Sequence, residues 1–175
     1  MRLALFQPDI PQNTGAIIRL SACFGIPLDI IEPCGFILSD AKLRRSGMDY
    51  LNLANIERHI SWDAFIKERK QSRLVLITTK AEDSLNQFAF DDDDTLILGR
   101  ESSGVPQLVH DAIPEKVRIP MDKKARSLNV SIAAGIILWE ALRQTRNFDW
   151  NYLTLWSTKS ARTSSNFDIY LDALL

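Results

Sequence analysis

Two glycines, two hydroxyls and a carboxylate follow an apolar run in LILGRESSGVP, residues 96–106. Such a run is typical of a β-strand that ends in a tight turn, and polar groups at a strand end can face a ligand. A purely structural turn, with Gly99 at positive φ and Ser102 or Ser103 capping a helix, is favoured when the motif is taken alone. Glu101 fits that role less well, because a carboxylate beside a strand end has little structural work to do.

The turn GRESSG matches neither common phosphate-binding loop. It lacks the middle glycine of the dinucleotide motif GxGxxG and the lysine of the motif GxxxxGK[ST]. The sequence therefore disfavours both a Rossmann dinucleotide site and a P-loop.

A second candidate group lies in IPQNTGAIIRL, residues 10–20. Asn13 or Thr14 can simply cap the helix that the apolar spacing predicts here. Arg19 is harder to explain, because a semi-buried guanidinium normally has a carboxylate or phosphate partner. We expect Arg19 to be semi-buried and to pair with Glu101 or with a ligand.

Two basic segments could bind phosphate groups. Their cations are Lys42, Arg44, Arg45, Lys123, Lys124 and Arg126. The second segment leads into Ser127 and Asn129 at a predicted helix N-terminus, where backbone N–H groups attract anions. Either segment alone is ordinary surface, but together they could follow a nucleic-acid backbone. His59 and His110 belong to no local motif and are interpreted as structural or surface residues.

Apolar periodicity predicts the elements that must position these groups. Strands are predicted at 2–6, 28–33, 56–60, 73–79, 95–99 and 116–120, and helices at 13–24, 62–70 and 129–144, with a short basic helix possible at 40–50. This alternation predicts an α/β fold with a mostly parallel sheet, whose ligands bind beyond the carboxyl ends of the strands. The helix at 129–144 is apolar on most faces, so we expect it to be largely buried.

Length and composition favour one soluble globular domain. The chain has 175 residues, of which 46% are hydrophobic and 25% charged. A net charge of −1 argues only weakly against nucleic-acid binding, because a basic patch can coexist with an acidic surface. Neither a signal peptide nor a membrane-spanning run is evident. Cys23 and Cys34 belong to no cluster, so we expect a cytoplasmic protein without a disulfide framework or a metal site.

Three motifs occur in a characteristic order: NTGAIIRL, LGRESSGVP and RIPMDKKARSLNVSIAAGIILWEALRQ. Together they resemble the motifs of the SPOUT superfamily of RNA methyltransferases, which use S-adenosylmethionine. The stretches LFQPDIPQNTGAIIRL and LRRSGMDY are similar to those of its small tRNA enzymes. Those enzymes methylate the ribose 2'-OH of the wobble nucleotide, position 34, in leucine tRNAs, where the base is cytidine or a modified uridine.

The resemblance covers residues 2–146 and implies a methyltransferase domain at 1–146. The extension at 147–175 carries clustered aromatic residues, so we expect it to pack on the core or on a partner and to be partly flexible. The resemblance implies an α/β domain with a C-terminal trefoil knot, and a homodimer through the knot region with substrate sites across the interface. A bent S-adenosylmethionine would be held mainly by backbone groups of three loops. Carried onto this chain, its contacts fall on Ile77, Gly99, Ile119, Ser127 and Leu128.

The expected RNA substrate is the anticodon stem-loop of tRNA. Two alternatives stay open: 2'-O-methylation of another RNA such as rRNA, and a non-catalytic RNA-binding protein on the same fold. Some relatives carry proline at the position of Arg100, and no role is assigned to that side chain.

For methyl transfer we expect Arg19 to bind the neighbouring phosphate and to stabilise developing alkoxide charge. A guanidinium with a pKa above ~12 is a poor general base. The proton would leave to that phosphate, to Glu101 or to solvent. Asn13, Glu101 and Asn129 would orient these groups.

Overall fold

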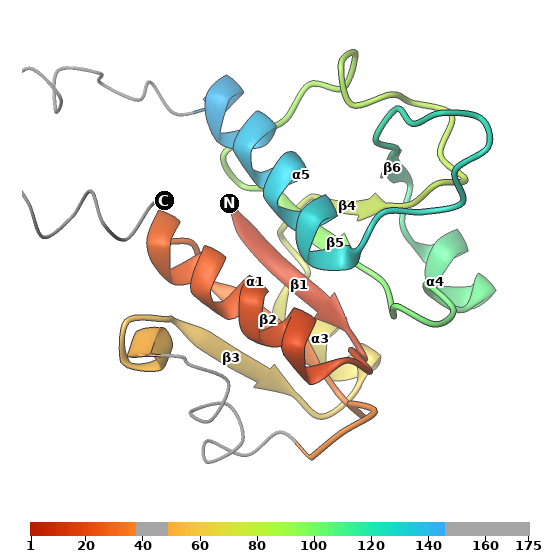
Figure 1. The fold of residues 1–175 in the computed structure, drawn as a ribbon. Helices are drawn as coiled ribbons and strands as arrows, with labels where there is room; N and C mark the ends of the chain where they lie inside the picture. Colours follow the sequence, from red (N-terminus) through yellow and green to blue (C-terminus); the bar gives the residue numbers. More distant parts are fainter. Residues whose placement is uncertain (38–48, 146–175) are drawn as a thin grey trace, which may run out of the picture. The chain divides into compact units, whose positions relative to one another are not determined.

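The computed structural model describes residues 1–37 and 49–145, which form a six-stranded, all-parallel sheet in the order β3-β2-β1-β5-β4-β6 (Figure 1). The strands are β1 (Arg2–Phe6), β2 (Leu28–Ile31), β3 (Ile56–His59), β4 (Leu74–Ile77), β5 (Thr95–Leu98) and β6 (Glu115–Val117). The helices are α1 (Pro11–Phe24), the 3-10 helix η1 (Asp49–Asn52), α3 (Trp62–Glu68), α4 (Gln107–Ala112) and α5 (Val130–Thr145). The predicted α/β class with a mostly parallel sheet is confirmed. The basic residues Lys42, Arg44 and Arg45 and the extension 147–175 lie outside the described residues.

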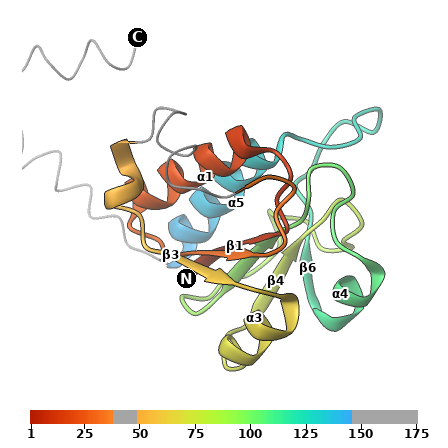
Figure 2. The ribbon, with the colours of Figure 1, turned by 90° about the horizontal axis from the view of Figure 1, so that it is seen from below.

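Helices cover both faces of the sheet, as a parallel sheet of buried strands requires. Figure 2 shows α1 and α5 on one face and α3 and α4 on the other. Successive residues of a strand point to opposite faces of the sheet, so alternate side chains of one strand pack against the two helix layers. In β1, Leu3 and Leu5 join the core beneath α1 and α5, whereas Ala4 and Phe6 join the core around Phe65 of α3.

The ends of α1 and α3 follow local capping rules. Pro11 occupies the first turn of α1, where its missing N–H is not needed, and Gly25 ends the helix in the left-handed region at φ 62°. The N-cap is Ile10, without a side-chain hydrogen bond, so the predicted capping by Asn13 or Thr14 is wrong. Ser61 caps α3 as its type indicates, because its hydroxyl accepts a hydrogen bond from the backbone N–H of Ala64 at 3.2 Å.

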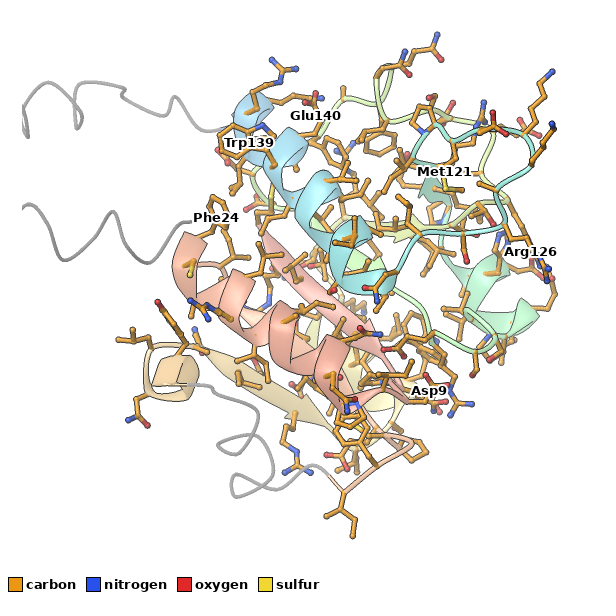
Figure 3. The ribbon with its side chains drawn as sticks, in the orientation of Figure 1. Asp9, Phe24, Met121, Arg126, Trp139 and Glu140 are labelled. Atoms are coloured by element: carbon orange, nitrogen blue, oxygen red, sulfur yellow. The ribbon has the colours of Figure 1, made fainter. Side chains whose placement is uncertain are left out.

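Helix α5 buries one face and exposes another apolar face. Its buried residues are Ala134, Ile137, Leu138, Ala141 and Leu142. Ile132, Ile136 and Trp139 are exposed, and Trp139 lies beside Phe24 of α1 at a ring-centroid distance of 6.4 Å (Figure 3). The prediction that this helix is largely buried is therefore wrong for that face. Among residues 1–37 and 49–145, no helix is long and apolar enough to cross a membrane.

The connection from β4 to β5, residues 78–94, is bonded to two later parts of the chain. At one end, the backbone N–H of Leu85 donates to the carbonyl oxygen of Arg118, which follows β6, at 2.9 Å. At the other end, Gln144 in the last turn of α5 accepts from the N–H of Phe90 at 3.0 Å and donates to the carbonyl oxygen of Phe88 at 3.1 Å. The segment before α5 and the last turn of α5 are therefore both hydrogen-bonded to this connection.

A buried charge network holds the sheet beneath α3. The carboxylate of Asp29 in β2 is fully buried and accepts hydrogen bonds from Arg2 at 2.8 Å and Arg69 at 2.7 Å, while the His59 ring lies 2.9 Å away. Burial raises the pKa of this carboxyl, but the hydrogen bonds from these three side chains outweigh it and lower the pKa to about 2. His59 is thus a buried structural residue. Glu57 also faces Asp29 and His59, and two guanidinium groups occupy the carboxylates, so the grouping is an ion-pair network.

Candidate active site

A cavity of about 530 Å³ opens beyond the carboxyl ends of β4, β5 and β6. Parallel α/β sheets bind ligands at this edge, and the volume is typical of a small-molecule site. Its lining comes from residues 76–80, 98–101, 103–105, 119, 121, 127–130 and 133, together with Ile10, Asn13 and His110. The three loops with unusual polar residues therefore converge on one hollow.

Two glycines give the turn after β5 its shape. The N–H of Arg100 donates to the carbonyl oxygen of Gly104 at 2.9 Å, and the N–H of Gly104 donates back to Arg100 at 2.9 Å. A Cβ on Gly99 would lie 2.7 Å from the carbonyl carbon of Gly104, which is closer than atoms can approach. Gly104, at φ 69°, takes the left-handed conformation expected of Gly99. Gly99 is thus required for a close backbone approach.

The turn does not lead directly into a helix. The next helix, α4, was not predicted, and its N-cap is Pro106, so neither Ser102 nor Ser103 caps it. The hydroxyl of Ser102 instead donates to the carboxylate of Asp9 in the loop after β1. This hydrogen bond therefore connects the turn after β5 to the loop after the neighbouring strand β1.

Three side chains from distant parts of the sequence form a hydrogen-bonded chain at the cavity wall. Asn13 donates through Nδ2 to Oε1 of Glu101 at 3.0 Å, and the other carboxylate oxygen of Glu101 accepts from the N–H of Asp9 at 3.0 Å. Asn129 donates through Nδ2 to Oδ1 of Asn13 at 3.0 Å. Asn129 also caps α5, because its Oδ1 accepts from the N–H of Ser131 at 2.8 Å. Glu101 therefore has a structural role, because it accepts hydrogen bonds from two other parts of the chain; its position in the sequence did not reveal that role.

Arg19 is not part of this hydrogen-bonded chain. Its side chain is exposed on α1, does not line the cavity, and lies with its guanidinium carbon 4.7 Å from the ring centroid of Tyr50. The prediction that Arg19 is semi-buried is wrong, and Glu101 is not its partner; the alternative, that Arg19 pairs with a ligand, stays a prediction. The two residues are separated because Arg19 follows Asn13 by six residues, which turns it away from the face of α1 that carries Asn13.

The residues assigned to a cofactor by resemblance all line the cavity. They are Ile77, Gly99, Ile119, Ser127 and Leu128. Apolar side chains at the ends of β4 and β5, together with the exposed backbone of the glycine turn, form a surface that suits a flat, uncharged ring system. Hydroxyls of Thr78, Thr79 and Ser127 supply hydrogen-bonding groups. The lining thus fits a nucleoside-sized ligand.

The described basic residues of the third loop lie outside this cavity. Lys123, Lys124 and Arg126 are exposed, and Arg126 points outward from the loop while Met121 of the same loop lines the cavity (Figure 3). These three residues therefore do not contact a ligand inside the cavity, and their binding to phosphate stays a prediction.

Two cations in the cavity wall were not assigned from the sequence. Lys80 lies three residues beyond the end of β4 at Ile77, and Arg100 lies two residues beyond the end of β5 at Leu98. The signal that could have found them is their position in the turn after a strand end, which is the same signal that singled out Glu101.

Comparisons with known proteins agree in the kind of chemistry. The chain matches the model of the SpoU rRNA Methylase family over residues 1–139. The tRNA (cytidine(34)-2'-O)-methyltransferase of Ancylobacter novellus is 49% identical over 150 residues, covering 85% of this chain and 95% of that relative. A structure reported under "Structural insights into the 2-OH methylation of C/U34 on tRNA" has a TM-score of 0.77 and 39% identity, covering 82% of this chain and 94% of that one.

A further structure is similar over part of its length. The SpoU methyltransferase AviRb from Streptomyces viridochromogenes, in complex with the cofactor AdoMet, has a TM-score of 0.73 and 26% identity. The match covers 82% of this chain and 60% of that one.

Proposed function

Because the chain belongs to the SpoU methylase family, we propose that it methylates the ribose 2'-OH of the wobble nucleotide, position 34, of tRNA. The observation that carries this proposal is the chain of hydrogen bonds from Glu101 through Asn13 to Asn129 at the wall of a nucleoside-sized cavity. Relatives named for this reaction match nearly their whole length to this chain. Leucine tRNAs are the expected substrates, and a cytoplasmic location follows from that substrate class.

The proposed cofactor is S-adenosylmethionine, which supplies the methyl group when bound. Ile77, Gly99 and Ile119 would hold its adenosine through backbone groups and apolar contact, with Ser127 and Leu128 closing the other side. Support comes from the fit of the lining to a nucleoside and from the AdoMet complex of a similar enzyme. Apolar walls that exclude water also strengthen every electrostatic interaction with the reacting groups.

The polar chain at the cavity wall would orient the substrate ribose. Asn13 and Asn129 each hold a fixed position because the carboxylate of Glu101 and the first turn of α5 fix their amides. Alignment of the attacking oxygen with the methyl carbon is worth several kcal/mol in such displacements, about 7 or more where it is complete. The hydroxyl proton would leave to a neighbouring phosphate, to Glu101 or to solvent.

Arg19 would bind the phosphate beside the reacting ribose and stabilise the developing alkoxide, and it would do so in the cavity of a second copy of the chain. It is exposed and lies outside the cavity of its own chain. The exposed apolar face of α5, made of Ile132, Ile136 and Trp139, supports the homodimer that the family resemblance implies. A site completed by the partner reconciles an exposed Arg19 with a role in catalysis.

We also infer the trefoil knot of the family. The support is the connection 78–94, which is bonded both to Arg118 before α5 and to Gln144 in its last turn. A chain threaded through this connection would hold the third loop against the first two, which is what a cavity shared by three loops needs.

The decisive experiment compares tRNA and rRNA from cells with and without the gene. Mass spectrometry of leucine tRNAs should show a 2'-O-methyl mark at nucleotide 34 that disappears in the deletion strain and returns with the wild-type gene. Purified protein should transfer a labelled methyl group from S-adenosylmethionine to a leucine tRNA transcript. A mark lost from rRNA instead would identify another substrate, and failure to bind S-adenosylhomocysteine would leave a non-catalytic RNA-binding protein.

A further inference from the structure

We propose that Arg100 binds a phosphodiester of the RNA substrate next to the methylated nucleotide. This inference rests on the proposed function and adds a substrate-binding residue that the sequence motifs leave without a role. Arg100 is one of the residues that line the cavity, and it follows Gly99 in the turn after β5.

One hydrogen bond fixes the guanidinium of Arg100, and it occupies only one of the donors of this group. Its Nε donates to the backbone carbonyl oxygen of Gln7 at 3.2 Å. Gln7 is itself held at the end of β1, where its N–H donates to the carbonyl oxygen of Ile31 at 2.8 Å. Among the described residues, the two Nη groups of Arg100 have no hydrogen-bond or ion-pair partner, which leaves four N–H donors on one planar fork.

Within residues 1–37 and 49–145, no acidic side chain forms an ion pair with this cation. The adjacent carboxylate of Glu101 accepts its hydrogen bonds from Asn13 and from the N–H of Asp9, not from Arg100. Lys80 is a second cation in the wall, so the two cations outnumber the single carboxylate of the lining. A planar fork with free donors is the geometry that recognises a phosphate in two hydrogen bonds.

The strand order distinguishes a phosphate from the carboxylate of the cofactor. Strand β5 lies between β1 on one side and β4 and β6 on the other. Arg100 is tethered to the end of β1, whereas the proposed cofactor contacts Ile77 and Ile119 follow β4 and β6. The hydrogen bond to Gln7 therefore holds the guanidinium on the β1 side of the cavity, where Asn13 would orient the ribose, and not on the β4 and β6 side, where the cofactor would bind. A sulfonium would also be repelled by a nearby guanidinium.

The test is a double-mutant cycle between protein and RNA. Wild-type protein, Arg100→Gln and Arg100→Lys are titrated with an anticodon stem-loop that carries either ordinary phosphates or one neutral methylphosphonate, 5' or 3' to nucleotide 34. Lys67→Gln removes one positive charge from α3 on the opposite face of the sheet and is the matched control. Thermal unfolding verifies that each variant is folded.

Arg100→Gln should weaken binding of the unmodified stem-loop about tenfold and reduce the slope of log K against log salt by about 0.7 to 1. The same substitution should cost little on one of the two methylphosphonate RNAs, because the partner charge is already gone. Arg100→Lys should retain the salt slope while losing part of the affinity. Binding of S-adenosylhomocysteine should stay within about twofold in every variant, and Lys67→Gln should match wild type.

An equal loss on all three RNAs, or no loss on any, would overturn the proposal for Arg100 while leaving the enzyme assignment intact. A loss of S-adenosylhomocysteine affinity without an RNA effect would assign the side chain to the cofactor carboxylate instead. Wild-type protein that binds neither the stem-loop nor S-adenosylhomocysteine would refute the proposed function itself.

Discussion

The side-chain amide of Asn13 donates a hydrogen bond of 3.0 Å to Glu101, a residue 88 positions away in the chain. The contact exists because Asn13 lies in the first turn of α1, beyond the end of β1, because Glu101 follows β5, and because β1 and β5 are hydrogen-bonded neighbours. It joins the first two of the three loops that line the cavity. Asn129 extends it to the third loop.

Glu101→Ala should therefore lower turnover more than it lowers cofactor affinity. The substitution leaves the amide of Asn13 and the N–H of Asp9 without their shared acceptor, which costs about 1–3 kcal/mol. We expect single-turnover methyl transfer to fall at least about tenfold while the Kd of S-adenosylhomocysteine changes little. Glu101→Gln keeps one acceptor oxygen, so its rate of methyl transfer should lie between those of wild type and Glu101→Ala. Equal turnover in all three proteins would show that this contact does not position the substrate.

Gly99→Ala should abolish cofactor binding and destabilise the fold. The new methyl group would collide with the backbone of Gly104 at 2.7 Å, and a backbone cannot move aside as a flexible side chain can. We expect a loss of roughly 1–3 kcal/mol in urea unfolding. Gly135→Ala is the control, because that helical glycine has open space around it and alanine should stabilise α5 by up to about 1 kcal/mol. A Gly99→Ala protein of wild-type stability would contradict the close approach.

Ile132→Glu and Ile136→Glu should dissociate the proposed homodimer. Each places a charge on the exposed apolar face of α5, where burial against a second copy would leave that charge unpaired. Sedimentation velocity should show a dimer for wild type and a monomer for the double variant. Leu108→Glu on α4 is the control, since that side chain is exposed on the opposite face of the sheet. Dissociation by the control variant, or a dimer in the double variant, would place the interface elsewhere.

The aromatic ring of Tyr50 should contribute to methylation of tRNA by holding Arg19 in place. The Arg19 guanidinium lies over that ring, an interaction worth about 0.5–1 kcal/mol at an exposed site. Tyr50→Leu should therefore lower kcat/KM for tRNA about two- to fivefold, while Tyr50→Phe retains it. In an Arg19→Gln background, Tyr50→Leu should have little further effect. Independent, additive losses would show that Tyr50 does not hold Arg19.

Stability should fall in acid through Asp29. Its pKa of about 2 lies below the 3.8 of an unperturbed aspartate, so the folded state is favoured when Asp29 is ionised. That contribution, about 2 kcal/mol, is fully present above pH ~4 and is lost as the pH falls toward 2. The difference in unfolding free energy between wild type and Asp29→Asn should therefore be large at pH 7 and shrink near pH 2.5. The exposed change Glu82→Gln is the control, and a pH-independent difference would contradict this assignment.

Local features of the fold could be predicted from single segments. The predicted strands are confirmed, and the end of α1 at Gly25 and the cap of α3 at Ser61 likewise depend on short-range sterics and hydrogen bonds. Helix α4 has only six residues, Gln107–Ala112, too few for a helical period to be evident, and it was missed. The exposed face of α5 was misjudged because an apolar helix face is the same in sequence whether a core or a partner chain covers it.

By itself the sequence determined the elements, the parallel α/β class and the three loops that carry chemistry, because periodicity and turn chemistry are local properties of the chain. Only the tertiary structure decided which side chains meet. It placed Glu101 on Asn13 rather than on Arg19, and it tethered Arg100 to Gln7. Those contacts are set by which strands are neighbours in the sheet and by how each helix is rotated on it, and neither is determined by any one segment alone.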